Sequence, residues 1–151
     1  EINPLTYEIK VERFVVAEDC GRLINPMIVD GQVHGGVAQG IGAALYEEVI
    51  YNEEGQNLTA SLVDYIVPTA TEIPPIDVLH IEAPSPTTLG GFRGMGEGGT
   101  IGAPAAIANA VADALAPLGI EIYELPVTPE RLFRLIENGQ HRKGSTHGHE
   151  A

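Results

Sequence analysis

One stretch of the chain, residues 27–46, reads MIVDGQVHGGVAQGIGAALY and sets its architecture. Its apolar and small residues recur at helical spacing, which predicts a long helix. Asn25 precedes the helix as a candidate N-cap, and Pro26 suits the first helical position. Each interior glycine of an exposed helix costs about 1 kcal/mol relative to alanine. We therefore expect something to pack very close to this backbone, which carries five glycines: Gly31, Gly35, Gly36, Gly40 and Gly42.

The rest of the chain alternates strand patterns with two further helices. Polar and apolar residues alternate in two expected strands, Tyr7–Glu18 and Ile76–Glu82. Four other elements are predicted: a hairpin over 49–58, a helix over Gly102–Leu118, a strand over Ile120–Tyr123 and a helix over Glu130–Glu137. This order predicts one α+β domain over residues 1–139, with helices packed on a mixed β-sheet. The polar tail, residues 140–151, is expected to be disordered.

Composition and charge exclude several classes of function. The chain has 151 residues, 44% of them hydrophobic, which fits a globular domain. Its net charge of −13 argues against nucleic acid or an anionic membrane as a partner. A single cysteine forms no internal disulfide and favours the cytoplasm, and no apolar run reaches the ~18 residues of a membrane span. Because the first residue is Glu1 and not Met, we expect a processed or partial chain.

The glycine-rich loop before the second long helix carries the most distinctive chemistry. Residues 90–99 read GGFRGMGEGG, and Arg93 is the only Lys or Arg between Leu23 and Glu130. Glycines let a backbone touch a ligand, and free N–H groups at a helix start attract anions. A carboxylate held there is a candidate general base, which makes Glu97 a functional hypothesis. The alternative is a surface loop with an incidental glutamate on an acidic protein.

The same loop matches a dinucleotide-binding fingerprint, Gly94-x-Gly96-x-x-Gly99. Two features count against this interpretation. The preceding strand is expected to end near Glu82, whereas the fingerprint needs an immediate turn from strand to helix. Glu97 would also lie inside the pyrophosphate cradle, where its charge repels the ligand.

Other polar side chains allow both a functional and a structural interpretation. Gln32 and Gln39 carry donor and acceptor atoms for a buried ligand, or they are exposed side chains on a tightly packed helix. His34 is more often a plain polar side chain than a ligand. Cys20 shows no convincing His or helix N-terminus that would activate it. Three histidines lie in the tail without fixed geometry for a metal: His141, His147 and His149.

Three motifs follow one another in a specific order. They are Asp19-Cys20-Gly21-Arg22-Leu23-Ile24-Asn25-Pro26, then Gly31-Gln32-x-x-Gly35-Gly36-x-x-Gln39-Gly40-x-Gly42, then Gly94-x-Gly96-Glu97. Together they resemble the C-terminal part of the molybdenum-binding large subunit of the xanthine oxidase family. The resemblance runs from about Val11 to Ile136 and looks closest to aerobic carbon monoxide or aldehyde dehydrogenases. The family's subunit is several times longer, so the resemblance implies that this piece alone is inactive.

The resemblance implies roles for individual residues. Glu97 matches the family's active-site glutamate, which acts as the base beside the molybdenum. The implied cofactor contacts fall on five positions: Gln39, Gly40, Arg93, Gly96 and Gly98. Arg93 would place a positive charge next to the anionic cofactor. No side chain of this chain is expected to bind the metal directly.

The resemblance also implies cofactors and partners. It implies molybdopterin with molybdenum, in the cytosine dinucleotide form, and iron–sulfur and FAD groups on partner chains of a hetero-oligomer. The implied reaction is oxidative hydroxylation of an aldehyde, a heterocycle or carbon monoxide. Two alternatives stay open: a non-catalytic interaction domain that has lost the cofactor, and a dinucleotide-binding domain that uses Gly94 to Gly99.

Overall fold

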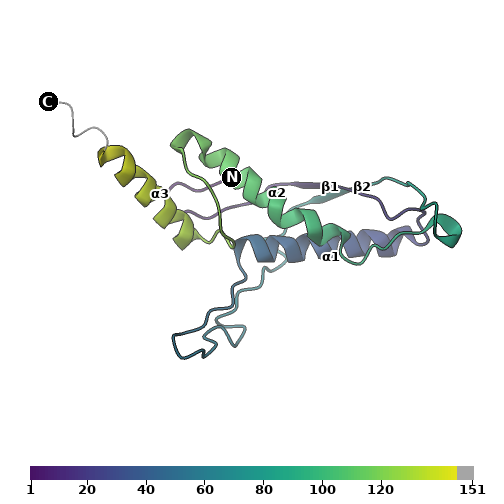
Figure 1. Cartoon of the computed structure of the whole chain (residues 1–151), viewed down its shortest axis with the longest axis horizontal. Helices are drawn as coiled ribbons and strands as arrows, with labels where there is room; N and C mark the ends of the chain where they lie inside the picture. The colour runs from purple at the N-terminus through teal and green to yellow at the C-terminus, as the bar shows by residue number, and fades with distance from the viewer. Residues whose placement is uncertain (146–151) are drawn as a thin grey trace.

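Two long helices form the centre of the molecule. The computed structural model describes residues 1–145, with side-chain surroundings for residues 1–139. Helix α1 spans Pro26–Leu45 and begins with Asn25, whose side chain accepts a hydrogen bond from Ile28 N. Helix α2 spans Gly98–Leu115 and lies along α1 (Figure 1). The core between and around them contains Val33, Val37, Ile41, Ala44, Ala103, Ile107, Val111 and Leu115.

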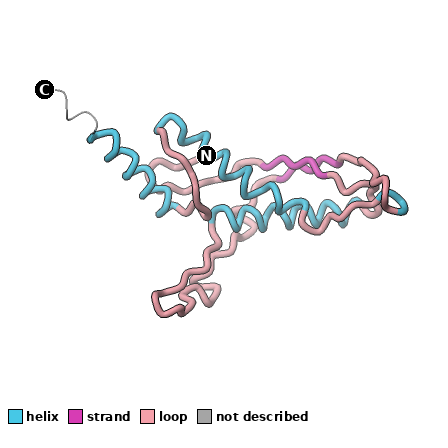
Figure 2. Tube along the Cα trace, in the orientation of Figure 1, coloured by secondary structure: helices cyan, strands magenta, loops and turns pink. Residues whose placement is uncertain are grey.

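A short parallel sheet packs beside the helix pair. Strand β1 is Phe14–Glu18 and strand β2 is Ile76–His80, paired in register from Phe14↔Ile76 to Glu18↔His80 (Figure 2). Alternate residues face the core and solvent, as a half-buried strand requires. The inward side chains pack against the core: Phe14, Val16, Ile76 and Val78. Both strands therefore end at the same edge, close to the start of α1.

The C-terminal part closes the other end of the core. A 3₁₀ turn, η2, spans Ala116–Leu118, and helix α3 spans Pro129–Ser145. Between them, Val127 N donates to Ala44 O at 2.7 Å and anchors the connection to the end of α1. Leu132 of α3 is fully buried there.

The expectation of an α+β domain is confirmed, and several boundaries differ from prediction. Within residues 1–145 the sheet has two parallel strands and is not mixed. Residues 7–13 and 120–123 are not strands, and the expected hairpin over 49–58 is a single isolated bridge, Tyr51↔Asn57. Within the described residues these segments pair at most through one isolated bridge, such as Ile2↔Ile9, so no continuous strand forms.

The helices also differ in length. Helix α2 begins four residues before Gly102, because the glycines that suggested a loop adopt helical geometry against α1. Helix α3 continues past Glu137 to Ser145 and includes the first residues of the expected tail, His141 among them. His147, His149 and the rest of residues 146–151 lie outside the described residues, so the prediction of disorder stays a prediction there.

Helix α2 differs from the expectation that no segment of the chain could span a membrane. Residues 98–118 are long and apolar enough to cross a membrane, with a mean hydropathy of 1.4, although only 22% of that window is buried. One side of this helix packs on α1, where Gly99 and Ala103 are buried, whereas Ile101 is exposed. We therefore interpret α2 as a core helix with one uncovered face.

Candidate functional site

A hydrogen-bonded clasp joins the end of β1 to the loop that follows β2. Asp19 Oδ1 accepts from Gly21 N at 2.9 Å and from Ala83 N at 3.1 Å. Arg93 Nε donates to Ala83 O at 2.8 Å and lies 3.5 Å from Asp19 Oδ2. The pKa of Asp19 lies below its usual range, chiefly because the two backbone N–H groups favour its charged form, with the Arg93 charge adding to the effect. The charge of Arg93 is thus paired within the protein.

Glycine and cysteine complete the clasp. Gly21 has a φ of +68°, and a Cβ there would collide with Gly91 O, so only glycine fits. Arg93 N donates to Cys20 O at 2.8 Å. The Cys20 thiol is buried, and burial raises its pKa. A raised pKa keeps the thiol protonated, which disfavours Cys20 as a nucleophile.

The chain then runs into the loop that holds Glu97. Gln32 Nε2, on α1, donates to Gly96 O at 2.6 Å and ties the loop to that helix. Glu97 occupies the N-cap position of α2 without capping it through its side chain. Its carboxylate is exposed and has no hydrogen bond or ion pair to residues 1–139. The structure therefore presents an unpaired carboxylate on a tethered backbone.

The first turn of α2 is fixed from the other side of Glu97. Thr100 Oγ1 lies 3.0 Å from Gly36 O and 3.4 Å from Gln39 Oε1, both on α1. A Cβ added at Gly36 would come within 2.9 Å of Gly99 Cα, so the two backbones touch. The contact of the two helices determines where Glu97 lies.

The structure brings most of the predicted site residues together. Gly96, Glu97 and Gly98 are consecutive at the start of α2, and Gln39 lies beside its first turn. Gly98 leaves room for the carboxylate of Glu18, which a Cβ would meet. Two predicted residues are placed differently. Gly40 is buried against Ala103 of α2, and Arg93 is engaged in the clasp.

The glycines of α1 divide into two groups. Gly36 and Gly40 are explained by the close packing of α2, which confirms for these two positions that something packs very close to the α1 backbone. Gly31 and Gly35 have nothing within 4 Å of an added Cβ. Gly94 and Gly96, in the loop, are equally open. These four positions leave bare backbone near Glu97 that a ligand can approach.

Sequence reasoning missed a second polar contact near this site. His80 Nε2, at the end of β2, lies 2.7 Å from Asp30 Oδ1 on α1. His80 Nδ1 is buried and has no hydrogen-bond partner. The alternation of β2 could have placed His80 facing inward, but its partner fifty residues earlier carries no sequence signal.

The structure tests the other interpretations of this region. Strand β2 ends at His80 and α2 begins only at Gly98, so the immediate strand-to-helix turn of a dinucleotide fingerprint is absent here. Among the residues that the structure describes, no three His, Cys, Asp or Glu side chains are grouped to hold a metal ion. Bare glycine backbone, a helix start and one free carboxylate instead fit a metal held within an organic cofactor.

Comparisons with known proteins agree with this geometry. A family model of the molybdopterin cofactor-binding domain matches residues 1–74. The nicotine 6-hydroxylase large subunit of Paenarthrobacter nicotinovorans is 52% identical over 134 residues, which is 89% of this chain and 16% of that protein. The carbon monoxide dehydrogenase large chain of Hydrogenophaga pseudoflava is 36% identical over 91% of this chain and 17% of its own length.

A solved structure carries the same arrangement. Quinoline 2-oxidoreductase from Pseudomonas putida 86 superposes with a TM-score of 0.88 at 52% identity, over 90% of this chain and 17% of that one. The chain belongs to the molybdenum-binding large subunits of the xanthine oxidase family. It spans about one sixth of the length of the relatives that it matches. The Glu97 loop, α1 and the clasp therefore lie in one portion of such a large subunit.

Proposed function

We propose that this chain forms one wall of the molybdenum cofactor site of a hydroxylase, with Glu97 as the general base. The observation that carries the proposal is the carboxylate of Glu97, which is unpaired within residues 1–139 while its backbone is held by Gln32 and Thr100. A base needs a fixed position and a free lone pair, and this arrangement supplies both.

The residues around Glu97 suit the binding of an anionic cofactor. Gly96 brings open backbone to the start of α2, where helix N–H groups favour phosphate, and Gly98 beside it is proposed to contact the cofactor on the side away from the Glu18 carboxylate. The amide of Gln39, on α1, lies beside the first turn of α2 and can turn from Thr100 to a pterin. When bound, the cofactor supplies a two-electron acceptor for oxidation of the substrate. We assign Arg93 to the clasp and not to the cofactor, because its Nε donates to Ala83 O and lies beside Asp19.

Glu97 would move a proton during the reaction. Its carboxylate accepts the proton of the oxygen nucleophile while that oxygen attacks the substrate carbon. The open glycines beside Glu97 leave space for the substrate. The hydrogen bond from Gln32 of α1 to Gly96 O holds the loop in place. General base catalysis of this kind contributes about 10²–10⁴-fold to a rate.

Replacement of Glu97 in the assembled enzyme tests the proposal. Glu97→Gln keeps the size of the side chain and removes the base, so we expect kcat to fall about 10²–10⁴-fold. Molybdenum content, measured by elemental analysis, should stay unchanged. Glu124→Gln, on the exposed connection before α3, is the matched control. Turnover of Glu97→Gln near wild type would remove the base assignment, and an assembled protein without molybdenum would favour a non-catalytic interaction domain.

We further propose a nitrogen heteroaromatic ring as the substrate class. Two relatives that share 52% identity with this chain are a nicotine hydroxylase and a quinoline oxidoreductase, whereas the carbon monoxide dehydrogenase shares 36%. A panel of pyridine and quinoline compounds, aliphatic aldehydes and carbon monoxide would decide the class. Higher kcat/KM for an aldehyde or for carbon monoxide than for every heterocycle would contradict it.

The electron partners and the cofactor form complete the proposal. We propose that iron–sulfur and FAD groups on separate chains accept the electrons, and that the cofactor is the cytosine dinucleotide. The 6-hydroxypseudooxynicotine dehydrogenase, 46% identical to this chain over 134 residues, is named as a complex with a subunit gamma, which supports a multi-subunit assembly. Iron and flavin analysis of the complex purified from its native source checks the electron partners. Release of CMP on acid hydrolysis checks the cytosine dinucleotide form.

A further inference from the structure

A long connection between α1 and β2 projects away from the body of the molecule (Figure 1). Its outer part, residues 49–67, is here termed the arm and contains neither a helix nor a strand. Connections longer than about 12–15 residues without secondary structure are uncommon in compact domains and usually have a function. The hydrogen bonds of the arm are local. Leu58 N donates to Ile50 O at 2.8 Å, and at the base Tyr65 Oη donates to Glu47 Oε2 at 2.5 Å.

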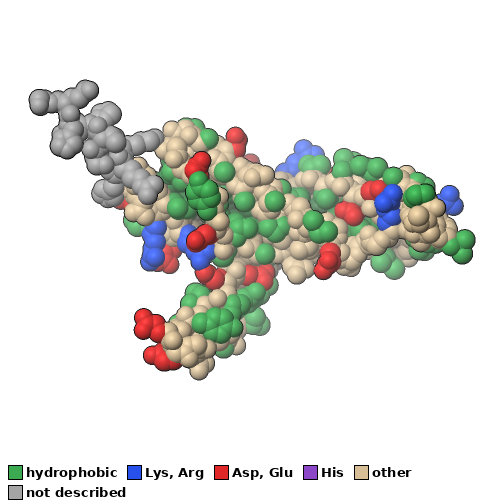
Figure 3. Space-filling model, in the orientation of Figure 1, with side chains coloured by type: hydrophobic (Ala, Val, Ile, Leu, Met, Phe, Trp, Pro, Cys, Tyr) green, Lys and Arg blue, Asp and Glu red, His purple; other side chains and the backbone are tan. Residues whose placement is uncertain are grey.

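The arm exposes a concentration of large apolar side chains, from 43% exposed at Ile50 to 90% at Val63. Figure 3 shows hydrophobic side chains covering much of its visible face. The eight residues are Val49, Ile50, Tyr51, Leu58, Leu62, Val63, Ile66 and Val67. Disordered linkers lack such residues, and soluble proteins seldom leave such a patch uncovered. Even a complete two-stranded hairpin is only marginally stable in water, and the arm has a single bridge, so we expect another surface to cover it.

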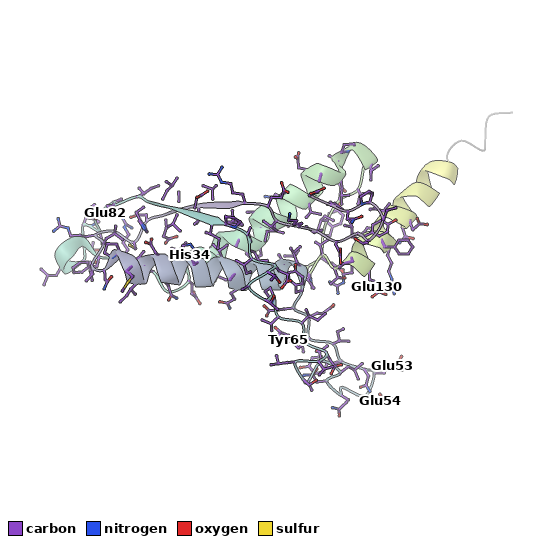
Figure 4. All side chains as sticks on the ribbon, turned by 180° about the vertical axis from the view of Figure 1, so that it is seen from behind. His34, Glu53, Glu54, Tyr65, Glu82 and Glu130 are labelled. Carbon is purple, nitrogen blue, oxygen red and sulfur yellow. The ribbon has the colours of Figure 1, made fainter. Side chains whose placement is uncertain are left out.

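The negative charge of the arm limits which protein surfaces can bind it. Glu53 and Glu54 lie at its tip (Figure 4), Asp64 follows, and residues 49–67 contain no Lys, Arg or His. The whole chain carries a net charge of −13. A second copy of this chain would therefore bring like charge to the arm, which disfavours self-association. A surface with apolar side chains and Lys or Arg near the tip complements it.

The apolar surface of the arm continues onto the body. A hollow of about 890 Å³ opens at the arm base, between the end of α1, the return of the connection and the N-terminal segment. Its apolar lining includes Leu45, Tyr46, Ile66, Val67, Ile73 and Val127. One partner surface can therefore cover the arm and fill the hollow together.

We propose that the arm docks into an apolar groove, bordered by Lys or Arg, on the part of the same large subunit that lies outside these residues. The chain accounts for 16% of one relative and 17% of another, so most of the subunit is available as the occupant. Besides the surface of the arm, the inference depends only on the family assignment and not on the proposed role of Glu97. Loss of the Glu97 proposal would leave it intact, and its own failure would leave Glu97 untouched.

Photo-crosslinking in the assembled complex with the full-length large subunit identifies the occupant. A photoreactive amino acid replaces Val63, and a second preparation carries it at Leu5, which is 88% exposed on the N-terminal segment, as the matched control. We expect Val63 to crosslink within its own polypeptide, to peptides outside these 151 residues that contain Lys or Arg. Crosslinks to another subunit, or to a second large subunit, would overturn the proposal.

Hydrogen exchange of the unmodified complex tests, without any variant, whether the arm is covered. We expect backbone amides of residues 49–67 to exchange at least about tenfold more slowly than in an unstructured peptide of the same sequence. Exchange at the peptide rate would show that the arm is free in water and would overturn the proposal. The double variant Glu53→Lys, Glu54→Lys should speed this exchange, whereas Asp113→Lys on α2 should leave the arm unchanged. Equal exchange in both variants would remove the basic border from the proposal.

Discussion

At the scale of single residues, the position of Glu97 depends on polar side chains that lie elsewhere in the sequence. Gln32 holds the carbonyl before Glu97 at 2.6 Å, and Thr100 holds the turn after it through Gly36 O at 3.0 Å. Both bonds anchor to α1. Gln32 is therefore a positioning residue that acts through the Gly96 backbone.

We expect Gln32→Ala to lower kcat by about ten- to a hundredfold, because small displacements of a reacting group have effects of this size. KM and molybdenum content should stay near wild type, and amides of residues 94–98 should exchange faster with deuterium. Gln56→Ala, on the arm, is the control for loss of a glutamine. Loss of cofactor together with activity would instead show that Gln32 binds the cofactor, and unchanged kcat would remove its role.

Replacement of Arg93 distinguishes a structural role of this side chain from a contact with the cofactor. Its Nε bond to Ala83 O should contribute about 1 kcal/mol, so Arg93→Met should lower the midpoint of thermal unfolding of the large subunit. Cofactor content should be unchanged. The opposite pattern, with normal unfolding and reduced cofactor content, would support the contact that the family resemblance implied.

At the scale of elements, the crossing of α1 and α2 is set by glycine. Gly36 faces Gly99, and Gly40 faces Ala103, so the two backbones approach closely where the site begins. Close approach brings Thr100 within reach of α1 and fixes the first turn of α2. Larger residues at these positions would separate the helices and move Glu97.

Adjacent glycines on α1 provide a matched pair for testing this crossing. Gly36→Ala should cost about 1–3 kcal/mol, because the new Cβ would lie 2.9 Å from Gly99 Cα. Gly35→Ala meets nothing within 4 Å in this chain and should leave the unfolding midpoint unchanged or raise it through better helix propensity. Denaturant unfolding of the large subunit measures both. Equal destabilisation by the two variants would contradict the assignment of Gly36 alone to the crossing.

At the scale of the whole molecule, much apolar surface stays uncovered. The arm is one such region, and the outer face of α2, with Ile101 77% exposed, is another. We expect the isolated chain to enhance the fluorescence of the apolar dye ANS, and the assembled large subunit to do so far less. The variant Leu62→Ser, Val63→Ser should lower the enhancement by the isolated chain. Equal dye binding by the chain and the large subunit would contradict this prediction.

The sequence predicted the positions of single helices and strands better than the segments against which they pack or pair. The caps and spacing of α1 and the alternation of β2 are properties of neighbouring residues, and both elements were located to within a residue or two. The alternating residues 120–123 form no strand, because a strand exists only when another chain segment pairs with it. The glycines at the start of α2 suggested a loop, and only the packing against α1 explains their helical conformation.

By itself, the sequence determined the type of chemistry: a carboxylate on a glycine-rich loop before a helix, in motifs that specify the family. Only the tertiary structure decided which residues serve that carboxylate. Arg93, four residues before Glu97, turns away to Asp19, whereas Gln32, sixty-four residues before Gly96, holds the loop. The physical reason is that a hydrogen bond depends on distance in space, and the crossing of two helices brings distant residues together.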